Sequence, residues 1–165
     1  MGKYILPFDT KDAALETVGG KGRSLSEMTL AGLPVPGGFH IITDAYRGFV
    51  SANDLQARIL AEAAGSGKGA ATSERIAEMF AQAEISADAA KEIKDAYAKL
   101  GDNPAVAVRS SANAEDLPDM SFAGQQETFL NVHGEHALLE SCKRCFASLF
   151  TNRAISYRVD KGFDH

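Results

Sequence analysis

Two separated segments carry the residues whose types and spacing could bind phosphate. Arg109 is followed by two serines, and a Phe-Ala-Gly-Gln-Gln run occupies residues 122–126. A guanidinium is a permanently charged planar fork that matches phosphate oxygens bidentately. Gly124 lets a backbone approach a ligand closely because it has no Cβ. Further hydroxyl donors come from Ser110, Ser111 and Thr128. This segment therefore predicts a loop that could bind a polyphosphate.

The second segment is Gly-Gly-Lys-Gly at residues 19–22, which belongs to a turn expected at 18–22, immediately before a helix expected at 23–31. Helix N-termini bind anions because they present backbone N–H groups and a partial positive charge. Lys21 adds a point charge on a flexible stem. Ser24 and Glu27 are expected to form a capping pair there. On spacing alone, a structural turn with a surface lysine is the better interpretation, and a phosphate site is the alternative.

Arg109 also has a structural interpretation, which is an ion pair with a nearby carboxylate. Three candidates lie close in the sequence: Glu115, Asp116 and Asp119. Carboxylates of this kind could also bind Mg²⁺, which prefers oxygen ligands. We interpret them as residues that shape the turn and balance the charge of Arg109, and not as metal ligands.

The elements that must position these residues follow from apolar periodicity and from the glycine and proline positions. Strands are expected at 4–8, 38–43, 105–108 and 127–132. Helices are expected at 23–31, 45–50, 55–64, 73–83, 86–100 and 134–150, the last continuing or restarting from 152 to about 159. Thr43 or Asp44 is expected to cap the second helix, and Ser86 the fifth. The pattern predicts an α/β (α+β) fold with short strands and several packed helices.

Length and composition limit the classes of protein that fit. A chain of 165 residues has room for one domain, or for one lobe of a larger domain. The net charge of −5 argues against a general nucleic-acid binder, which would carry a basic stripe. The apolar run at 5–8 is too short to be a signal peptide or to span a membrane. We therefore expect a cytoplasmic protein with neither a nucleic acid nor a membrane as its partner.

Two short motifs invite functional interpretations that we do not adopt. Cys142 and Cys145 have the C-x-x-C spacing of a redox pair or of half a zinc site. They fall well inside an expected helix, on an apolar stripe, so core packing is the better interpretation. The Gly-Ser-Gly-Lys-Gly run at 65–69 resembles the end of a Walker A loop but lacks its first glycine and its final Ser or Thr. We interpret it as a linker between helices.

Read as a pattern, the two phosphate-binding candidates resemble one family. RSSANAEDLPDMSFAGQQETFLNV, at 109–132, resembles the nucleotide-binding segment of the pyruvate, water dikinases (phosphoenolpyruvate synthases) and pyruvate phosphate dikinases. VGGKGRSL at 18–25, followed by GLPVPGGF at 32–39, is similar to the opening of the same family. The two matches come in the expected order and cover nearly the whole chain. The resemblance implies that residues 1–165 are the first lobe of an ATP-grasp-like nucleotide-binding domain.

The resemblance also implies roles for particular residues. Lys21 would contact the nucleotide phosphates, and Arg109 would grip the triphosphate and support phosphoryl transfer, so these are the two predicted catalytic residues. The predicted nucleotide-binding residues are Gly20, Lys21, Gly22, Arg109, Ser110, Gly124, Gln125 and Thr128. The implied cofactors are ATP and Mg²⁺. The metal ligands of the family belong to a later part of the domain, so no metal ligand is predicted in this chain.

The family's reaction requires domains that this sequence does not contain. Its members move the β-phosphate of ATP to a histidine on a swivelling domain, release AMP and phosphate, and pass the phosphoryl group to pyruvate. None of the four histidines here lies in a phosphohistidine segment. We therefore expect a piece or a split subunit of a larger enzyme, inactive alone, whose partners are ATP and the remaining domains. Relatives that phosphorylate rifampicin or phenol are alternatives, as is a non-catalytic interaction or regulatory module.

Overall fold

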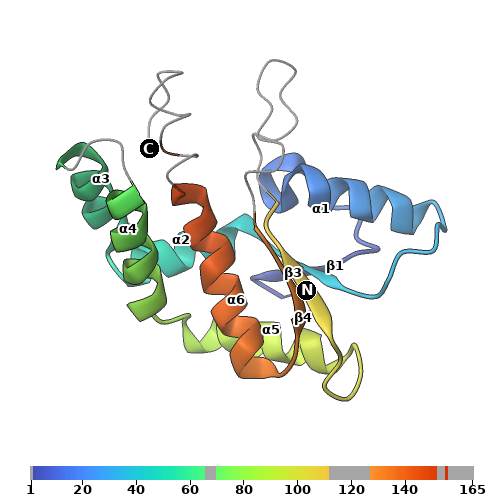
Figure 1. The fold of residues 1–165 in the computed structure, drawn as a ribbon. Coiled ribbons are helices and arrows are strands. Elements are labelled where there is room, and N and C mark those ends of the chain that lie inside the picture. Colours follow the sequence, from blue (N-terminus) through green and yellow to red (C-terminus); the bar gives the residue numbers. More distant parts are fainter. Residues whose placement is uncertain (1, 66–69, 112–126, 152–154, 156–165) are drawn as a thin grey trace.

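A computed structural model of the chain describes residues 2–65, 70–111, 127–151 and 155. It combines helices with short strands (Figure 1). In chain order the elements are β1 (Ile5–Pro7), α1 (Leu15–Leu30), β2 (Phe39–Ile41), α2 (Thr43–Ala52), α3 (Leu55–Gly65), α4 (Ala70–Gln82), α5 (Ala87–Ala98), β3 (Val106–Arg109), β4 (Thr128–Val132), α6 (Glu135–Ala147) and the 3-10 turn η1 (Ser148–Phe150). The mixed α and β class predicted from the sequence is confirmed. Each predicted strand is present: β1, β2 and β4 are shorter than predicted, and β3 is shifted by one residue.

The strands form two antiparallel pairs. β1 pairs with β2, with Leu6 opposite His40, and β3 pairs with β4, with Arg109 opposite Thr128. The register of the second pair shifts between Val106 and Val108, because β4 contributes one more residue than β3 over that stretch. Asn131, in β4, has a φ of 55° there. A residue in this left-handed region is typical of a bulge, which bends a strand and increases its twist.

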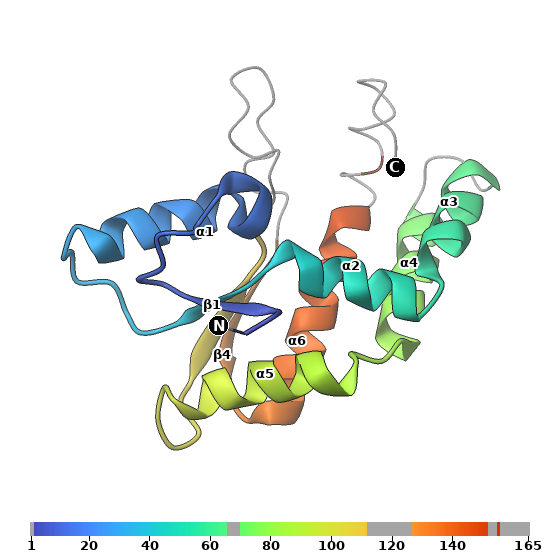
Figure 2. The same ribbon diagram turned by 180° about the vertical axis from the view of Figure 1, so that it is seen from behind.

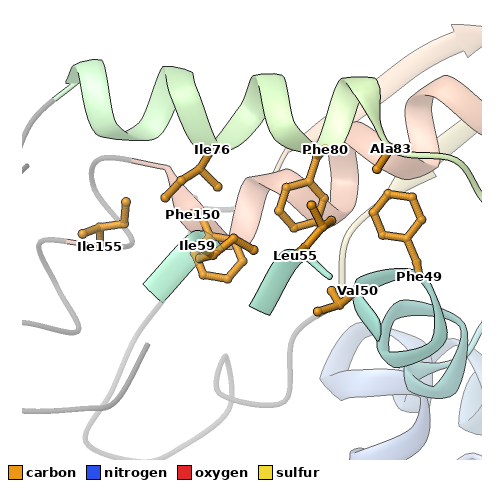
Figure 3. Close-up of a cluster of buried hydrophobic side chains, with 9 residues drawn as sticks. All are labelled: Phe49, Val50, Leu55, Ile59, Ile76, Phe80, Ala83, Phe150 and Ile155. Carbon is orange, nitrogen blue, oxygen red and sulfur yellow. The ribbon is translucent and has the colours of Figure 1, made fainter. Parts of the chain in front are cut away.

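Helix α6 lies between the β3–β4 pair and helix α4 (Figures 1 and 2). On its α4 side, a cluster of buried residues comes from α2, α3, α4 and η1 (Figure 3). Phe49 stacks against Phe80 with ring centroids 5.8 Å apart, close to the preferred offset geometry. The members are Phe49, Val50, Leu55, Ile59, Ile76, Phe80, Ala83, Phe150 and Ile155. The helix predicted at 73–83 corresponds to α4, whose Ile76 and Phe80 face inward.

A second buried cluster fills the space between α5, α6 and the strands. Its members are Ile93, Tyr97, Val132, Leu138 and Cys142. Burial raises the pKa of Cys142 to about 12, and that of Cys145 to about 12 as well. Thiols that stay protonated at neutral pH are poor nucleophiles and poor metal ligands. The prediction that the C-x-x-C pair is core packing is therefore confirmed.

The helix ends differ in part from the prediction. Ser86 caps α5, since its side chain accepts a hydrogen bond from the backbone N–H of Ala89 at 3.4 Å. The predicted cap of α2 is wrong: the N-cap residue is Ile42, Thr43 bonds elsewhere, and Asp44 pairs with Arg47. Gly65 ends α3, and the rest of the Gly-Ser-Gly-Lys-Gly run lies outside the described residues. Most of the predicted helical extension at 152–159 also lies outside the described residues.

No helix within the described ranges is long and apolar enough to cross a membrane. Over the same residues, no group of three or more His, Cys, Asp or Glu side chains gathers where it could hold a metal ion.

Candidate functional site at the break in helix α1

Helix α1 is broken at Gly19. Its φ of 71° and ψ of 175° are not helical, so Leu15–Val18 form one turn and a second helical segment starts at Gly20. The prediction placed a turn at 18–22 and the helix start at 23, and both limits are wrong. The glycines of the motif lower helix propensity, but only Gly19 leaves the helical region. Gly20, Lys21 and Gly22 therefore make up the first turn of the second segment.

The break changes the hydrogen bonding of both halves of α1. In an unbroken helix, the carbonyls of Glu16 and Thr17 would accept from the N–H groups of residues 20 and 21. Here the hydroxyl of Thr43 donates to both carbonyls, at 2.6 Å for Glu16 and 2.9 Å for Thr17. The N–H groups of residues 20–22 accordingly lie at the N-terminal end of a helical segment, the position at which proteins bind anions.

The predicted capping pair of Ser24 and Glu27 is wrong. Both residues lie inside the second segment, beyond its first turn, where a side chain has no terminal N–H group to accept from. Glu27 pairs instead with Arg23 at 2.8 Å, and both side chains are exposed. The amide of Gly22 is capped from a distant part of the chain.

That distant partner is Ser111. The backbone N–H of Gly22 donates to the Oγ of Ser111 at 3.0 Å. A Cβ placed on Gly19 would lie 2.6 Å from the carbonyl carbon of Ser111, and still closer to its two oxygens. No side chain fits there, and the positive φ of Gly19 favours glycine as well. The two phosphate-binding candidates of the sequence are thus in direct contact.

Arg109 lies two residues before Ser111, as the last residue of β3. Side chains on one face of a strand recur every second residue, and in β3 the even positions point inward while Ala107 and Arg109 are exposed. Thr128 is directly opposite Arg109 and is exposed too. The N–H of Ser110 donates to the carbonyl of Glu127 at 3.4 Å, which extends the pairing past Arg109.

The structure therefore brings together most of the predicted nucleotide-binding residues. Gly20, Lys21 and Gly22 form one side, and Arg109 and Ser110 form the other, with Thr128 on the neighbouring strand. Lys21 is half-buried and Arg109 is exposed. Gly124 and Gln125 lie outside the described residues, as do the three carboxylates considered as partners of Arg109.

A buried polar pair lies directly beneath Gly22. His40, in β2, is 7% exposed, and its Nε2 is 2.8 Å from the Oγ of Ser26, which is fully buried in α1. The ring of Phe8 covers the imidazole, with ring centroids 4.7 Å apart. Burial lowers the pKa of His40 to about 4, so the imidazole is neutral at pH 7. Sequence reasoning missed this pair, because nothing local marks a histidine in a strand as the partner of a serine in a helix.

A surface hollow of about 430 Å³ lies elsewhere, between α2 and α3. It is lined by Tyr46, Arg47, Val50, Ser51, Asp54, Gln56 and Ala57. None of these residues was predicted to bind a ligand, and none lies at the break in α1. The candidate site is thus an open surface between a helix end and a strand end, and not this hollow.

A helix end that contacts Ser111, two residues after an exposed arginine, is an arrangement that suits anions, and comparison with known proteins gives the family. Residues 15–165 match the family described as pyruvate phosphate dikinase, AMP/ATP-binding domain. The chain belongs to this family. It is 46% identical to the phosphoenolpyruvate synthase of Pseudomonas aeruginosa over 178 aligned residues, which take in the whole of this chain.

Two other relatives show the breadth of the family. The chain is 45% identical to a probable phosphoenolpyruvate synthase of Methanocaldococcus jannaschii, with 92% of the chain covered. It is 40% identical to a rifampicin phosphotransferase of Bacillus cereus, with 100% covered. The chain spans only 22%, 14% and 20% of the Pseudomonas, Methanocaldococcus and Bacillus proteins respectively.

Proposed function

We propose that the break in α1 and the end of β3 form the phosphate-binding half of an ATP site, in the first lobe of an ATP-grasp-like domain that residues 1–165 make up. The observation that carries this proposal is the contact of Gly19 and Gly22 with Ser111. It joins the segment of Lys21 to the segment of Arg109. Two cations from distant parts of the sequence are thereby available to one polyphosphate.

Each residue of the site has a role that its chemistry suits. Lys21 contacts the phosphates as a point charge, and Arg109 grips the triphosphate with its planar fork. The backbone N–H of Gly20 and the hydroxyls of Ser110 and Thr128 add donors, while Gly22 holds the turn in place through its hydrogen bond to Ser111. Phosphoryl transfer is catalysed mainly by positioning and charge neutralisation. Losing one such cation would therefore slow the parent enzyme by about 10³-fold or more.

The residues at the break fit the anionic part of ATP, and not its metal. Their donors are backbone amides, hydroxyls and two cations, which suit phosphate oxygens and would repel Mg²⁺. When bound, Mg²⁺ would neutralise phosphate charge. We propose that its ligands lie in other parts of the parent enzyme. Gly124 and Gln125, which lie between β3 and β4 in the sequence and outside the described residues, are proposed as further members of the site.

The parent enzyme is proposed to be a phosphoenolpyruvate-synthase-like phosphotransferase. It would move the β-phosphate of ATP to a histidine and then to pyruvate, releasing AMP and phosphate. The relatives named phosphoenolpyruvate synthase support pyruvate as the acceptor. The Bacillus relative supports rifampicin as the alternative. In either case the remaining domains, or separate subunits, would supply the acceptor site and the histidine.

The test is an amide NMR titration of this chain with Mg-ATP, with Arg109→Ala and Lys99→Ala compared. Lys99 follows α5 and is exposed, so Lys99→Ala is the matched control that removes a surface cation away from the site. We expect shifts at residues 20–22, 109–110 and 128, lost in Arg109→Ala and kept in Lys99→Ala. If millimolar Mg-ATP shifts none of these amides, in the chain or in the full-length parent, the proposed site is wrong.

A further inference from the structure

We propose that His40 and Ser26 are positioning residues of this site, whose buried hydrogen bond fixes the direction of the Gly22 N–H group. The expected effect on nucleotide binding rests on the proposed function. The contacts among His40, Ser26 and Gly22 do not depend on any ligand. Neither residue needs to touch the nucleotide. Both act through the first turn of the second α1 segment.

The contacts of His40 reach α1 at two successive turns. Residues four apart lie on one face of a helix, so Gly22 and Ser26 both face β2. The Nε2 of His40 bonds to Ser26, and a Cβ placed on Gly22 would lie 3.3 Å from its Nδ1. The same Cβ would lie 2.9 Å from the Cβ of Val18. The imidazole therefore lies close to the Cα of Gly22, on the side where a side chain would project.

The imidazole is itself held from two sides. Pairing of β1 with β2 places Leu6 opposite His40, and Phe8, just beyond β1, covers the ring. An apolar residue in place of His40 would leave the fully buried hydroxyl of Ser26 without this partner, which is costly in the interior of a protein. A polar, neutral side chain of this length is thus required at position 40.

Gly22 is consequently held between two contacts. Ser111 accepts its N–H, while the imidazole of His40 occupies the space beside its Cα that a side chain would need. The hydrogen bond from Gly22 to Ser111 joins the segment of Lys21 to the segment of Arg109, and groups that are held in place before the ligand arrives lose less freedom on binding. Loosening the imidazole support should therefore weaken phosphate binding although no ligand contact is removed.

The test uses Ser26→Ala and His40→Leu, which break the pair, and His40→Gln, whose amide can reach Ser26. We expect the Kd for Mg-ATP to rise about tenfold in the first two, the effect of losing one preorganised group. His40→Gln should restore most of the affinity. Tyr97→Phe is the control, because it removes a buried hydroxyl that bonds Pro104 and Gly134 at the other end of the β3–β4 pair.

A second measurement, hydrogen exchange of the Gly22 amide without ligand, separates this inference from the proposed function. We expect exchange to speed up in Ser26→Ala and His40→Leu but not in Tyr97→Phe. Unchanged exchange in both variants, or an equal effect of Tyr97→Phe, would overturn the inference even if ATP binds. If the wild-type chain and its parent fail to bind ATP, the proposed function falls, and faster exchange would still support the role of His40 in holding Gly22. Should His40→Leu not fold, Ser26→Ala decides.

Discussion

Arg109 lies directly opposite Thr128 in the β3–β4 pair, and both side chains are exposed on the same face. Opposite residues in an antiparallel pair have Cβ atoms about 5 Å apart. A guanidinium and a hydroxyl at that separation can bind oxygens of the same phosphate chain. The contact of Ser111 with Gly22 then places this pair beside the first turn of the second α1 segment.

Truncating this pair should weaken nucleotide binding in a graded way. We expect Arg109→Ala to raise the Kd for Mg-ATP at least about tenfold, because a charge-assisted bidentate contact is lost. Thr128→Val keeps the shape and removes one neutral donor, so about a threefold rise is expected. Isothermal titration calorimetry measures both. An equal loss in Lys99→Ala would show that the effect is one of net charge.

A series of glycine substitutions separates backbone strain from steric collision. Gly32 has a φ of 75° with no atom within 4 Å of a Cβ placed there, so Gly32→Ala should cost about 1 kcal/mol of stability from strain alone. Gly19→Ala has a similar φ and collides with Ser111 as well, so we expect a loss of about 2–4 kcal/mol. Gly48→Ala, at an exposed position in α2 where a Cβ would meet only the ring of Tyr4 at 3.8 Å, should stabilise by about 0.5–1 kcal/mol. Urea denaturation checks all three.

If Gly19→Ala costs no more than Gly32→Ala, the close contact of Gly19 with Ser111 does not exist in solution. In that case Gly19→Ala should also leave nucleotide binding unchanged. That result would contradict the proposed site, which depends on this contact.

Acid should destabilise the chain through His40. Its pKa is near 6.5 when unfolded and about 4 when folded, so between these values the unfolded chain binds the additional proton. The contribution is fully present above pH 6.5 and is lost as the pH falls toward 4. Allowing for solvent screening, we expect a loss of about 2 kcal/mol. Urea midpoints measured across this pH range for the wild type and for His40→Gln isolate the contribution of His40. If the midpoints of both proteins fall equally with decreasing pH, His40 is not the group responsible.

The two cysteines should resist alkylation in the native protein. Burial keeps both thiols protonated and covered, so iodoacetamide at pH 8 should label them only when the structure opens. We expect slow labelling of the native chain and complete labelling in urea, measured by intact mass. Rapid labelling of one residue under native conditions would show a reactive thiol and would reopen the redox interpretation.

Local patterns predicted the parts of the fold that local physics determines. The strand predicted at 105–108 corresponds to β3, and the helix predicted at 73–83 corresponds to α4, which buries Ile76 and Phe80. The hydroxyl of Ser86 followed by a helical run identified a cap. In each case neighbours within a few residues determine the outcome, and the structure agrees.

The rest depends on partners far away in the sequence. Gly19 leaves the helical region at the point where Ser111 packs against it. Thr43 was expected to cap α2, but its hydroxyl donates to two carbonyls of α1 instead. The pairing of His40 with Ser26 requires β2 to lie under α1. For the site, motif resemblance supplied the candidate residues, whereas their proximity came only from the fold.

The hydrogen bond between Gly22 and Ser111 also has a consequence for how the chain folds. It joins residues 89 positions apart, and the closure entropy of such a long loop must be offset before the contact contributes any stability. Contacts within the helices and between adjacent strands involve much shorter loops. We therefore expect the phosphate-binding surface to be assembled after most of the helical scaffold. A folding intermediate would then contain native helices while remaining unable to hold a nucleotide.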